Sequence, residues 1–443
     1  MNRKQIILSV LLACATSHIC AQKITLGNST TADGGQYKGE LVSGKPQGKG
    51  KATYKNGNWY EGEFVKGKRQ GYGVYTFYDG EKYEGQWFQD HQHGKGTYYF
   101  ANNNKYDGLW YRDYQQGTGT MYYYNGDKYE GQWKQDKRNG QGVYTFAGGA
   151  YYKGTWLNDK KNGQGVFDWG DGSRYEGNWL ENQRSGKGTF RYADGDVYVG
   201  QWKNDIQNGR GIYKFKNGDV YEGDYVQGER TGTGIFKFAN GDKYSGQFRE
   251  GDKSGQGTLT WKNGDVYTGG WKEDRQDGQG KLVMKNGDVY EGDYVQGERT
   301  GSGIFKYANG DKYTGQFRDG DKSGQGTLAW KNGDVYTGGW KEDRQDGQGK
   351  LVMKNGDVYE GQWKGGKLNG QCIIHYADGS KFKGQFKNDL RHGPAIEEDK
   401  DGKRFEGNYV DNKRDGEFVE KDRNGNITAK GTYSAGWRTV KKN

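Results

Sequence analysis

An aromatic residue recurs every 23 residues through almost the whole chain, and this period constrains the fold more than any other feature of the sequence. A Gly follows two residues after each of these 17 aromatics, and another Gly follows eleven residues after each. A further aromatic lies four residues after 16 of them, with Leu41 as the exception. A period without insertions indicates tandem units that stack on one another. The recurring aromatics are Tyr37, Tyr60, Tyr83, Tyr106, Tyr129, Tyr152, Tyr175, Tyr198, Tyr221, Tyr244, Tyr267, Tyr290, Tyr313, Tyr336, Tyr359, Phe382 and Phe405.

Alternation within each unit predicts two β-strands. The aromatic, the Gly and the second aromatic occupy alternating positions, so they share one face of a strand. A second alternating stretch follows, for example residues 73–77, with Tyr75 and Phe77 on one face. An Asn-Gly or Asp-Gly pair precedes the next unit in 15 units. Such pairs favour tight hairpin turns, because both residues tolerate a positive φ.

The length of the Asn-Gly or Asp-Gly turn can be predicted from the requirement that the aromatic side chains share one face of the sheet. A two-residue loop at Asp79-Gly80 would place Tyr83 on the face opposite Phe77. A three-residue loop, residues 78–80 with a Gly bulge, pairs Tyr75 with Tyr83 and keeps these aromatics together. The sequence therefore predicts the three-residue loop. The other connection, for example residues 66–71, is predicted to be a longer polar loop at the rim of the sheet.

Together these features predict an all-β, elongated repeat protein in which tandem antiparallel β-hairpins form one long twisted sheet with a groove. Hydrophobic residues make up only 31% of the chain, yet aromatics reach 15%, which argues against disorder. The Gly two residues after each aromatic is expected to let neighbouring rings lean over the backbone.

Four segments are expected along the chain: a signal peptide at 1–21, a short lead-in at 22–36, a regular array at 37–381, and degenerate repeats with a C-terminal cap at 382–443. Arg3 and Lys4 precede a short apolar run, and a cleavage region follows near Ala21. The protein is therefore expected to be exported to the periplasm, the cell envelope or the medium. In the alternative reading, residues 11–14 form a lipoprotein signal with a lipid anchor at Cys14.

The repeat resembles the MORN repeat (membrane occupation and recognition nexus). Residues 129–134, Tyr-Glu-Gly-Gln-Trp-Lys, with the Gly-x-Gly of residues 140–142, match it closely, and the resemblance extends from Tyr37 to about residue 425. It weakens near the end, where Cys372, Ala395 and Phe418 replace the second Gly of the pair. The resemblance implies a non-catalytic repeat scaffold.

A tandem duplication lies within the array. Residues 217–285 and 286–354 differ at only five positions. A spacer or a multivalent surface tolerates such lengthening more readily than an active site does.

No motif in the sequence predicts catalysis, a cofactor or a metal site. His91 and His93 supply only two ligands, in a segment expected to be a loop. Residues 399–402 and 422–425 resemble the start of a calcium loop, but the Glu that would complete it is absent, so they are interpreted as turns. Cys372 replaces a Gly on a predicted strand, and its sequence context offers no His/Asn pair that would indicate a nucleophile.

Two sets of residues are candidate contacts. Recurrent basic clusters could bind an anionic surface, since residues 23–216 carry 28 Lys and Arg against 21 Asp and Glu. The repeated aromatics are interpreted mainly as rings that stack to hold the sheet together, and the alternative is that they form a groove for an extended ligand. The basic candidates are Lys66, Lys68, Arg69, Lys137, Arg138, Lys160 and Lys161. The aromatic candidates are Tyr83, Trp87, Tyr106, Trp110, Tyr129, Trp133, Tyr152, Trp156, Tyr175, Trp179, Tyr198 and Trp202.

Three functions remain open from the sequence. The first is a scaffold in the cell envelope that binds an unidentified protein or self-associates, and the family resemblance favours it. The second is peripheral binding of anionic membrane lipids through the basic loops. The third is binding of an envelope glycan along the aromatic groove. A nucleic-acid partner is not expected for an exported chain.

Overall fold

The structure, a computed structural model, describes residues 23–439. The predicted signal peptide and the alternative anchor at Cys14 lie outside the described residues. The described chain contains 38 strands and no helix, and therefore no helix that could span a membrane. It divides into two compact units at Asp194–Gly195, with residues 203–205 grouped with the first unit.

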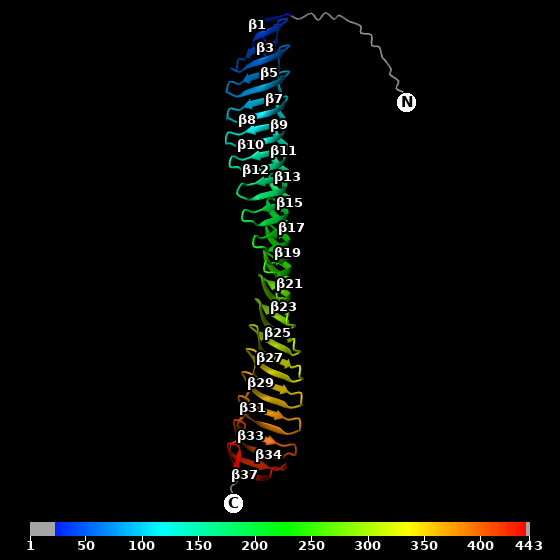
Figure 1. Cartoon of the computed structure of the whole chain (residues 1–443), viewed down its shortest axis with the longest axis vertical. Coiled ribbons are helices and arrows are strands. Elements are labelled where there is room, and N and C mark those ends of the chain that lie inside the picture. The colour runs from blue at the N-terminus through cyan, green and yellow to red at the C-terminus, as the bar shows by residue number, and fades with distance from the viewer. Residues whose placement is uncertain (1–22, 440–443) are drawn as a thin grey trace, which may run out of the picture. The chain divides into compact units, whose positions relative to one another are not determined.

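The first unit consists of short strands that follow one another in chain order (Figure 1). They are β1 (Ile24–Thr30), β2 (Gln36–Val42), β3 (Lys45–Thr53), β4 (Trp59–Val65), β5 (Lys68–Thr76), β6 (Lys82–Phe88), β7 (His91–Tyr99), β8 (Lys105–Tyr111), β9 (Tyr114–Tyr122), β10 (Lys128–Lys134), β11 (Lys137–Thr145), β12 (Tyr151–Leu157), β13 (Lys160–Asp168), β14 (Arg174–Leu180) and β15 (Gln183–Arg191).

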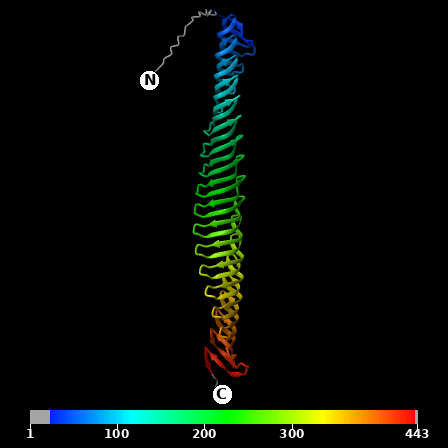
Figure 2. The ribbon, with the colours of Figure 1, turned by 90° about the vertical axis from the view of Figure 1, so that its right-hand side faces the viewer.

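The second unit repeats the same arrangement up to its C-terminal end (Figure 2). Its strands are β16 (Val197–Lys203), β17 (Ile206–Lys214), β18 (Val220–Val226), β19 (Glu229–Lys237), β20 (Lys243–Arg249), β21 (Asp252–Thr260), β22 (Val266–Lys272), β23 (Arg275–Val283), β24 (Val289–Val295), β25 (Glu298–Lys306), β26 (Lys312–Arg318), β27 (Asp321–Ala329), β28 (Val335–Lys341), β29 (Arg344–Val352), β30 (Val358–Lys364), β31 (Lys367–His375), β32 (Lys381–Lys387), β33 (Leu390–Glu398), β34 (Arg404–Val410), β35 (Lys413–Arg414), β36 (Gly416–Lys421), β37 (Ile427–Ser434) and β38 (Trp437–Thr439).

The predicted all-β fold of tandem antiparallel hairpins is confirmed. Strand β5 pairs with β6 in the predicted register, which places Tyr75 opposite Tyr83. The three-residue loop is also confirmed: the Phe77 N–H donates to the Glu81 carbonyl (2.9 Å), and the Gly80 N–H donates to the Phe77 carbonyl (3.1 Å). Gly80 has a φ of +92°, the left-handed conformation that the G1 bulge requires.

The prediction of a longer polar loop at residues 66–71 is wrong. Strand β5 already begins at Lys68, and only a two-residue turn, Lys66-Gly67, separates it from β4. The surplus residues are absorbed in a bulge of β5, where Gly71 has a φ of +67°. Polar composition suggested a loop, whereas the bulge keeps these residues within the sheet. The lead-in at 22–36 likewise contains a strand, β1, which pairs with β2.

Glycine pairs make room for the recurring Tyr, as expected. Gly85 lies opposite Gly96 across β6 and β7, and the ring of Tyr83 lies against both. A Cβ on Gly85 would fall 2.4 Å from the Gly96 Cα, and one on Gly96 would fall 2.3 Å from the Tyr83 hydroxyl. That hydroxyl donates to the Gln86 carbonyl at 2.9 Å. Larger residues are therefore excluded from both positions while the Tyr ring stays in place.

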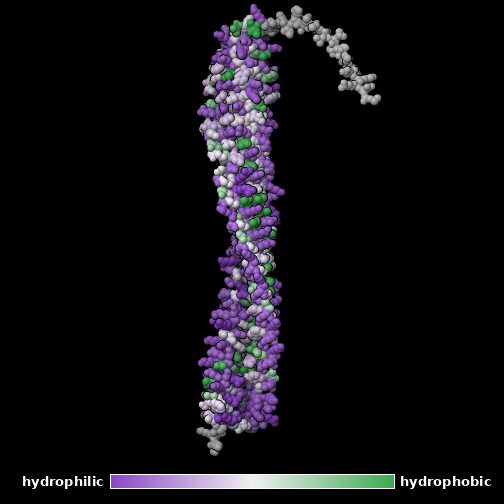
Figure 3. All heavy atoms as spheres, viewed as in Figure 1, coloured by the Kyte–Doolittle hydropathy of each residue, from purple (hydrophilic) through white to green (hydrophobic). Residues whose placement is uncertain are grey.

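Each 23-residue repeat packs against the next repeat through contacts between aromatic rings. We call this row of rings the ring zipper. The Tyr83 ring makes edge-to-face contacts with Trp87 of its own unit (5.2 Å between centroids) and with Trp110 of the next unit (5.3 Å). The same pair of contacts recurs along the array, and the Tyr rings from Tyr60 to Tyr336 are almost fully buried. On the visible surface, hydrophilic residues predominate and hydrophobic ones are scattered (Figure 3). Stability therefore comes from neighbour contacts.

In the last two repeats, Glu397 and Glu420 replace the first inward apolar residue of the second strand and form ion pairs. Glu397 takes the place of an inward aromatic and contacts Arg391 (3.0 Å), Arg414 and the Tyr409 hydroxyl. The Arg414 guanidinium lies 3.7 Å above the Phe405 ring. These charged groups thus partner one another beside the buried rings of this end of the chain.

Candidate binding groove

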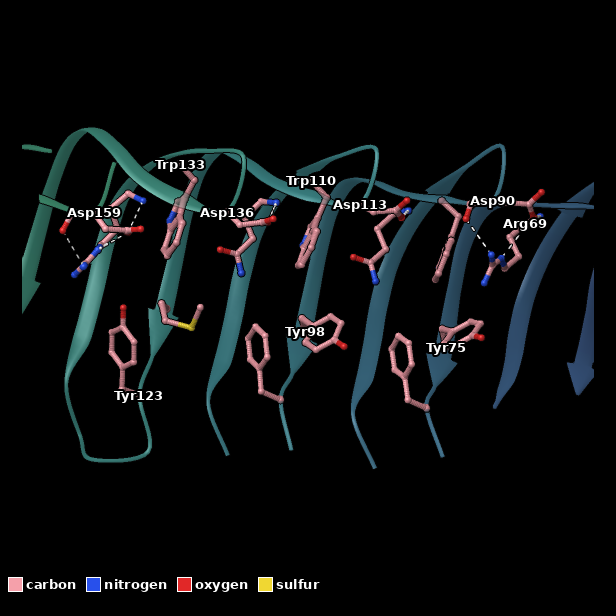
Figure 4. Close-up of a pocket in the computed structure, with 17 residues that line it drawn as sticks. Arg69, Tyr75, Asp90, Tyr98, Trp110, Asp113, Tyr123, Trp133, Asp136 and Asp159 are labelled. Atoms are coloured by element: carbon pink, nitrogen blue, oxygen red, sulfur yellow. Dashed lines mark hydrogen bonds and ion pairs between the residues drawn. The ribbon is translucent and has the colours of Figure 1, made fainter. Parts of the chain in front are cut away.

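A groove of about 770 Å³ lies on the aromatic face of the first unit. Figure 4 shows its lining as two rows, with Asp90, Asp113, Asp136 and Asp159 along one margin and Tyr75, Tyr98 and Tyr123 toward the other. We call this the inner groove. Its lining comes from strands β5 to β11, from the residues that directly follow β5, β7 and β9, and from two-residue turns, the last of which contains Asp159 and joins β12 to β13.

The predicted aromatic residues take two positions relative to the inner groove. Three of the predicted tryptophans line the groove: Trp87, Trp110 and Trp133. The tyrosines of the same repeats, Tyr83, Tyr106 and Tyr129, lie beneath this lining, and each is 0% exposed. Burial raises the pKa of each of these Tyr hydroxyls well above its ordinary value. Trp156, Trp179 and Trp202, and the tyrosines of their units, are buried in the ring zipper outside the groove lining.

The aromatic residues of the second strands complete the lining, and they were absent from the predicted site. Tyr75, Tyr98 and Tyr123 reach the groove, as do Phe77 and Phe100. The Tyr98 hydroxyl hydrogen-bonds the Glu81 carboxylate, which raises the pKa of Tyr98 further after burial. The alternation of residues 73–77 had placed such side chains on the aromatic face, so the signal was present in the sequence.

The second residue of each two-residue turn along the inner groove is an Asp. Its carboxylate accepts a hydrogen bond from a backbone N–H of the preceding 23-residue repeat. Asp113 Oδ1 accepts the Gln92 N–H at 2.7 Å, and Asp136 Oδ1 accepts the Gln115 N–H at 2.7 Å. Asp159 does the same for Arg138 at 3.0 Å. No sequence motif pointed to these contacts, because they join residues of consecutive units 21 positions apart.

The predicted basic residues separate into two groups. Arg69, Arg138 and Lys161 turn toward the aromatic face, where each lies over a Trp ring at 4.2–4.5 Å. Both Arg side chains also pair with an Asp, and the Arg138 Nε lies 3.0 Å from Asp159 Oδ1. The remaining four are exposed in or beside the two-residue turns, and Lys160 pairs with Glu181 at 3.3 Å. The exposed four are Lys66, Lys68, Lys137 and Lys160.

The pKa of Lys161 is strongly shifted. Burial among rings lowers its pKa to about 8, because a charged ammonium loses hydration there. The nearby Arg184 lowers it further, and Asp205 partly opposes the effect.

The inner groove is acidic although the chain as a whole is basic. Its lining contains two cations, Arg69 and Arg138, against the four Asp carboxylates of the turns. A cationic ligand therefore meets a favourable field in this groove.

The remaining candidate chemical groups have structural partners. His91 lies in β7, not in a loop as predicted, and its Nδ1 is 2.5 Å from Asp113 Oδ2. The His93 ring lies between Phe88 and Tyr111. Cys372 is buried, which raises its pKa to about 11. Residues 23–439 contain no group of three His, Cys, Asp or Glu side chains that could hold a metal ion.

The segments interpreted as turns rather than calcium loops do form turns. Asp399 Oδ1 accepts the N–H groups of Asp401 and Lys403 at 3.0 and 2.8 Å. Asp422 Oδ1 makes equivalent contacts with the N–H groups of Asn424 and Asn426 at 2.9 and 2.8 Å. These carboxylates are thus held by their own backbone.

Comparison with known proteins identifies the repeat. The model of the MORN repeat matches 17 consecutive segments that together span residues 37–427. No curated protein matches the sequence. Among solved structures, the TCP10 domain of Danio rerio CPAP, in complex with a peptide of Danio rerio STIL, is similar at 13% identity and a TM-score of 0.29, covering 54% of this chain and 99% of that one. The SAS-4 (dCPAP) TCP domain of Drosophila melanogaster, in complex with a proline-rich motif of Ana2 (dSTIL), is similar at 16% identity and a TM-score of 0.24, covering 35% of this chain and 85% of that one. Because the family model covers most of the sequence, the chain belongs to the MORN-repeat family.

Proposed function

We propose that this protein is a non-catalytic scaffold of the cell envelope that binds a protein partner in its inner groove. The observation that carries the proposal is the groove itself, a hollow lined by aromatic rings and carboxylates on a face that the rest of its unit leaves open. Aromatic-lined hollows with a few polar groups are the usual form of a binding site. The N-terminal sequence supports export, and the duplication of three units supports a surface that can be lengthened.

A second candidate is adsorption to anionic lipid, because four lysines are exposed in or beside two-residue turns: Lys66, Lys68, Lys137 and Lys160. These turns all join the first to the second strand of a unit, so they lie on one margin of the first unit. Each cation near an anionic membrane contributes about 1 kcal/mol, and the attraction falls with salt.

A photo-crosslinking amino acid at the groove residue Gln92 tests the scaffold function in cells that express the full chain. We expect a discrete protein adduct from this position. The matched control is Lys95 in the same strand, which is exposed and does not line the inner groove. Equal labelling from both positions, or no adduct from Gln92, would contradict binding in the groove.

Flotation with anionic vesicles that is lost in high salt would instead support the lipid function.

A further inference from the structure

Two arginines of this chain, Arg69 and Arg138, place their guanidinium groups in the inner groove and show which kind of group it accommodates. At Arg138 the guanidinium lies 4.4 Å above the Trp156 ring. Its Nε pairs with Asp159 Oδ1, and Nη2 donates to the Asp159 carbonyl at 3.1 Å. Arg69 is placed similarly at the other end of the groove: it lies over Trp87, its Nη2 donates to the Asp90 carbonyl at 3.0 Å, and its Nε lies 3.5 Å from Asp90 Oδ1. Each site combines an aromatic face with a carboxylate, the combination that favours guanidinium.

The two consecutive repeats between Arg69 and Arg138 have no Arg or Lys at the equivalent position. Gln92 and Gln115 occupy the position that Arg69 and Arg138 occupy in the flanking units. The carboxylate and the aromatic ring are still present in both repeats. Asp113 and Trp110 line the groove beside Gln92. Asp136 and Trp133 line it beside Gln115. Figure 4 shows these four side chains between the flanking sites.

The two glutamines have unused hydrogen-bonding capacity. Gln92 is 8% exposed and Gln115 is 5% exposed, and both line the groove. Their backbone N–H groups donate to Asp113 and Asp136, but within residues 23–439 their side-chain amides have no hydrogen-bond partner. Both amides are reachable from the groove, and an amide carbonyl oxygen can accept a hydrogen bond from a guanidinium.

The spacing of the two sites limits the shape of the ligand. The Tyr106 ring contacts Trp110 and Trp133 at 5.2 Å each, and consecutive units are two strands, or about 10 Å, apart. In a polyproline II segment, residues i and i+3 lie on one side and are about 9 Å apart. In a β-strand, residues that share a face are about 7 or 13 Å apart, which fits less well.

We propose that the inner groove binds an Arg-x-x-Arg segment of a partner protein in polyproline II conformation. This inference rests on the proposed function and deepens it. The two ligand arginines occupy the sites at Asp113 and Asp136, and they complete a row of four guanidinium groups that begins with Arg69 and ends with Arg138. Each ligand guanidinium donates to one Asp carboxylate and one Gln carbonyl. Asp113 is shared with His91, so the Asp136 site contributes more of the charge pairing.

The test uses fluorescence anisotropy of the labelled peptide Gly-Arg-Pro-Pro-Arg-Gly with the chain from residue 22 to 443. We expect saturable binding that weakens as ionic strength rises. The double variant Gln92→Arg/Gln115→Arg fills both sites with the residue that flanking units already use, and it should bind at least tenfold more weakly. The matched control Gln345→Arg, at the same repeat position in the second unit, should bind like the parent chain.

A second variant preserves the backbone caps. Asp113→Asn/Asp136→Asn keeps an acceptor oxygen, as Asn182 does natively for the Lys161 N–H, but removes both charges. It should also weaken binding at least tenfold. No saturable binding, equal binding to the first double variant, or equal binding of a Gly-Glu-Pro-Pro-Glu-Gly peptide would overturn the inference. If Gln92 still crosslinks to a partner in cells, the scaffold function stands although this ligand is wrong.

Discussion

The indole Nε1 of Trp110 donates a hydrogen bond to the carbonyl of Gly96 at 3.0 Å, and this bond joins one unit to the unit before it. Gly96 also belongs to the glycine pair under the Tyr83 ring. Trp110 thus contacts both the backbone and a ring of the preceding repeat. The coupling between units is local and directional.

Trp110→Phe should loosen this junction without preventing folding, because Phe64 occupies the same repeat position natively. The loss of one buried hydrogen bond should lower the opening free energy of amides in β7 and β8 by about 1–2 kcal/mol. Hydrogen exchange with mass spectrometry measures this locally. Trp437→Phe, at a residue that is 81% exposed, should change exchange nowhere in the array. Equal effects of both substitutions would contradict the interpretation.

Gly85→Ala should be far more disruptive than its size suggests. The new Cβ would lie 2.4 Å from the Gly96 Cα, so β6 and β7 must separate or the Tyr83 ring must leave its place. We expect a local loss of about 3 kcal/mol, again measured by hydrogen exchange. Gly148→Ala is the control, because a Cβ there meets nothing within 4 Å and the φ of Gly148 is not positive. Protection in β6 that survives Gly85→Ala would exclude the close-approach argument.

Lys161 should titrate near pH 8, and competitive acylation followed by mass spectrometry reports the midpoint. Burial makes the folded state bind this proton less tightly than the unfolded state does. The cost of the buried charge is therefore present below about pH 8 and is relieved as pH rises toward the ordinary Lys pKa of about 10.4. Relative to Lys161→Gln, the parent chain should gain stability in urea denaturation between these pH values. A constant difference would show that Lys161 is hydrated.

Cys372 should be almost inert in the folded chain. It is 2% exposed, and burial raises its pKa to about 11, so little thiolate forms at pH 8. In a chain that begins at Gln22, this cysteine should react with a disulfide reagent at least 100-fold more slowly than after unfolding in urea. A Thr118→Cys variant supplies an exposed thiol as the reference for the reagent. Comparable rates for the two thiols would show that β31 opens readily.

Periodicity predicted the fold in detail because side-chain alternation and turn chemistry are local. The register of Tyr75 with Tyr83 followed from requiring the rings to share a face, and the structure has it. The bulge at Gly71 escaped prediction, since a polar stretch in a bulged strand has the composition of a loop. The lining of the groove was found only in part. Contacts such as Asp136 with Gln115 join different units, and their partners are set by the stacking of units, which the sequence does not show.

The antiparallel pairing of each strand with the next also decides how the array responds to force. Tension applied along the chain loads the hydrogen bonds of an outermost hairpin one after another, so hairpins peel away singly and do not shear together. Each released unit of 23 residues adds about 80 Å of extended chain. Under load, the array would lengthen in equal steps, and after the load is removed each hairpin could re-form on the folded edge that remains.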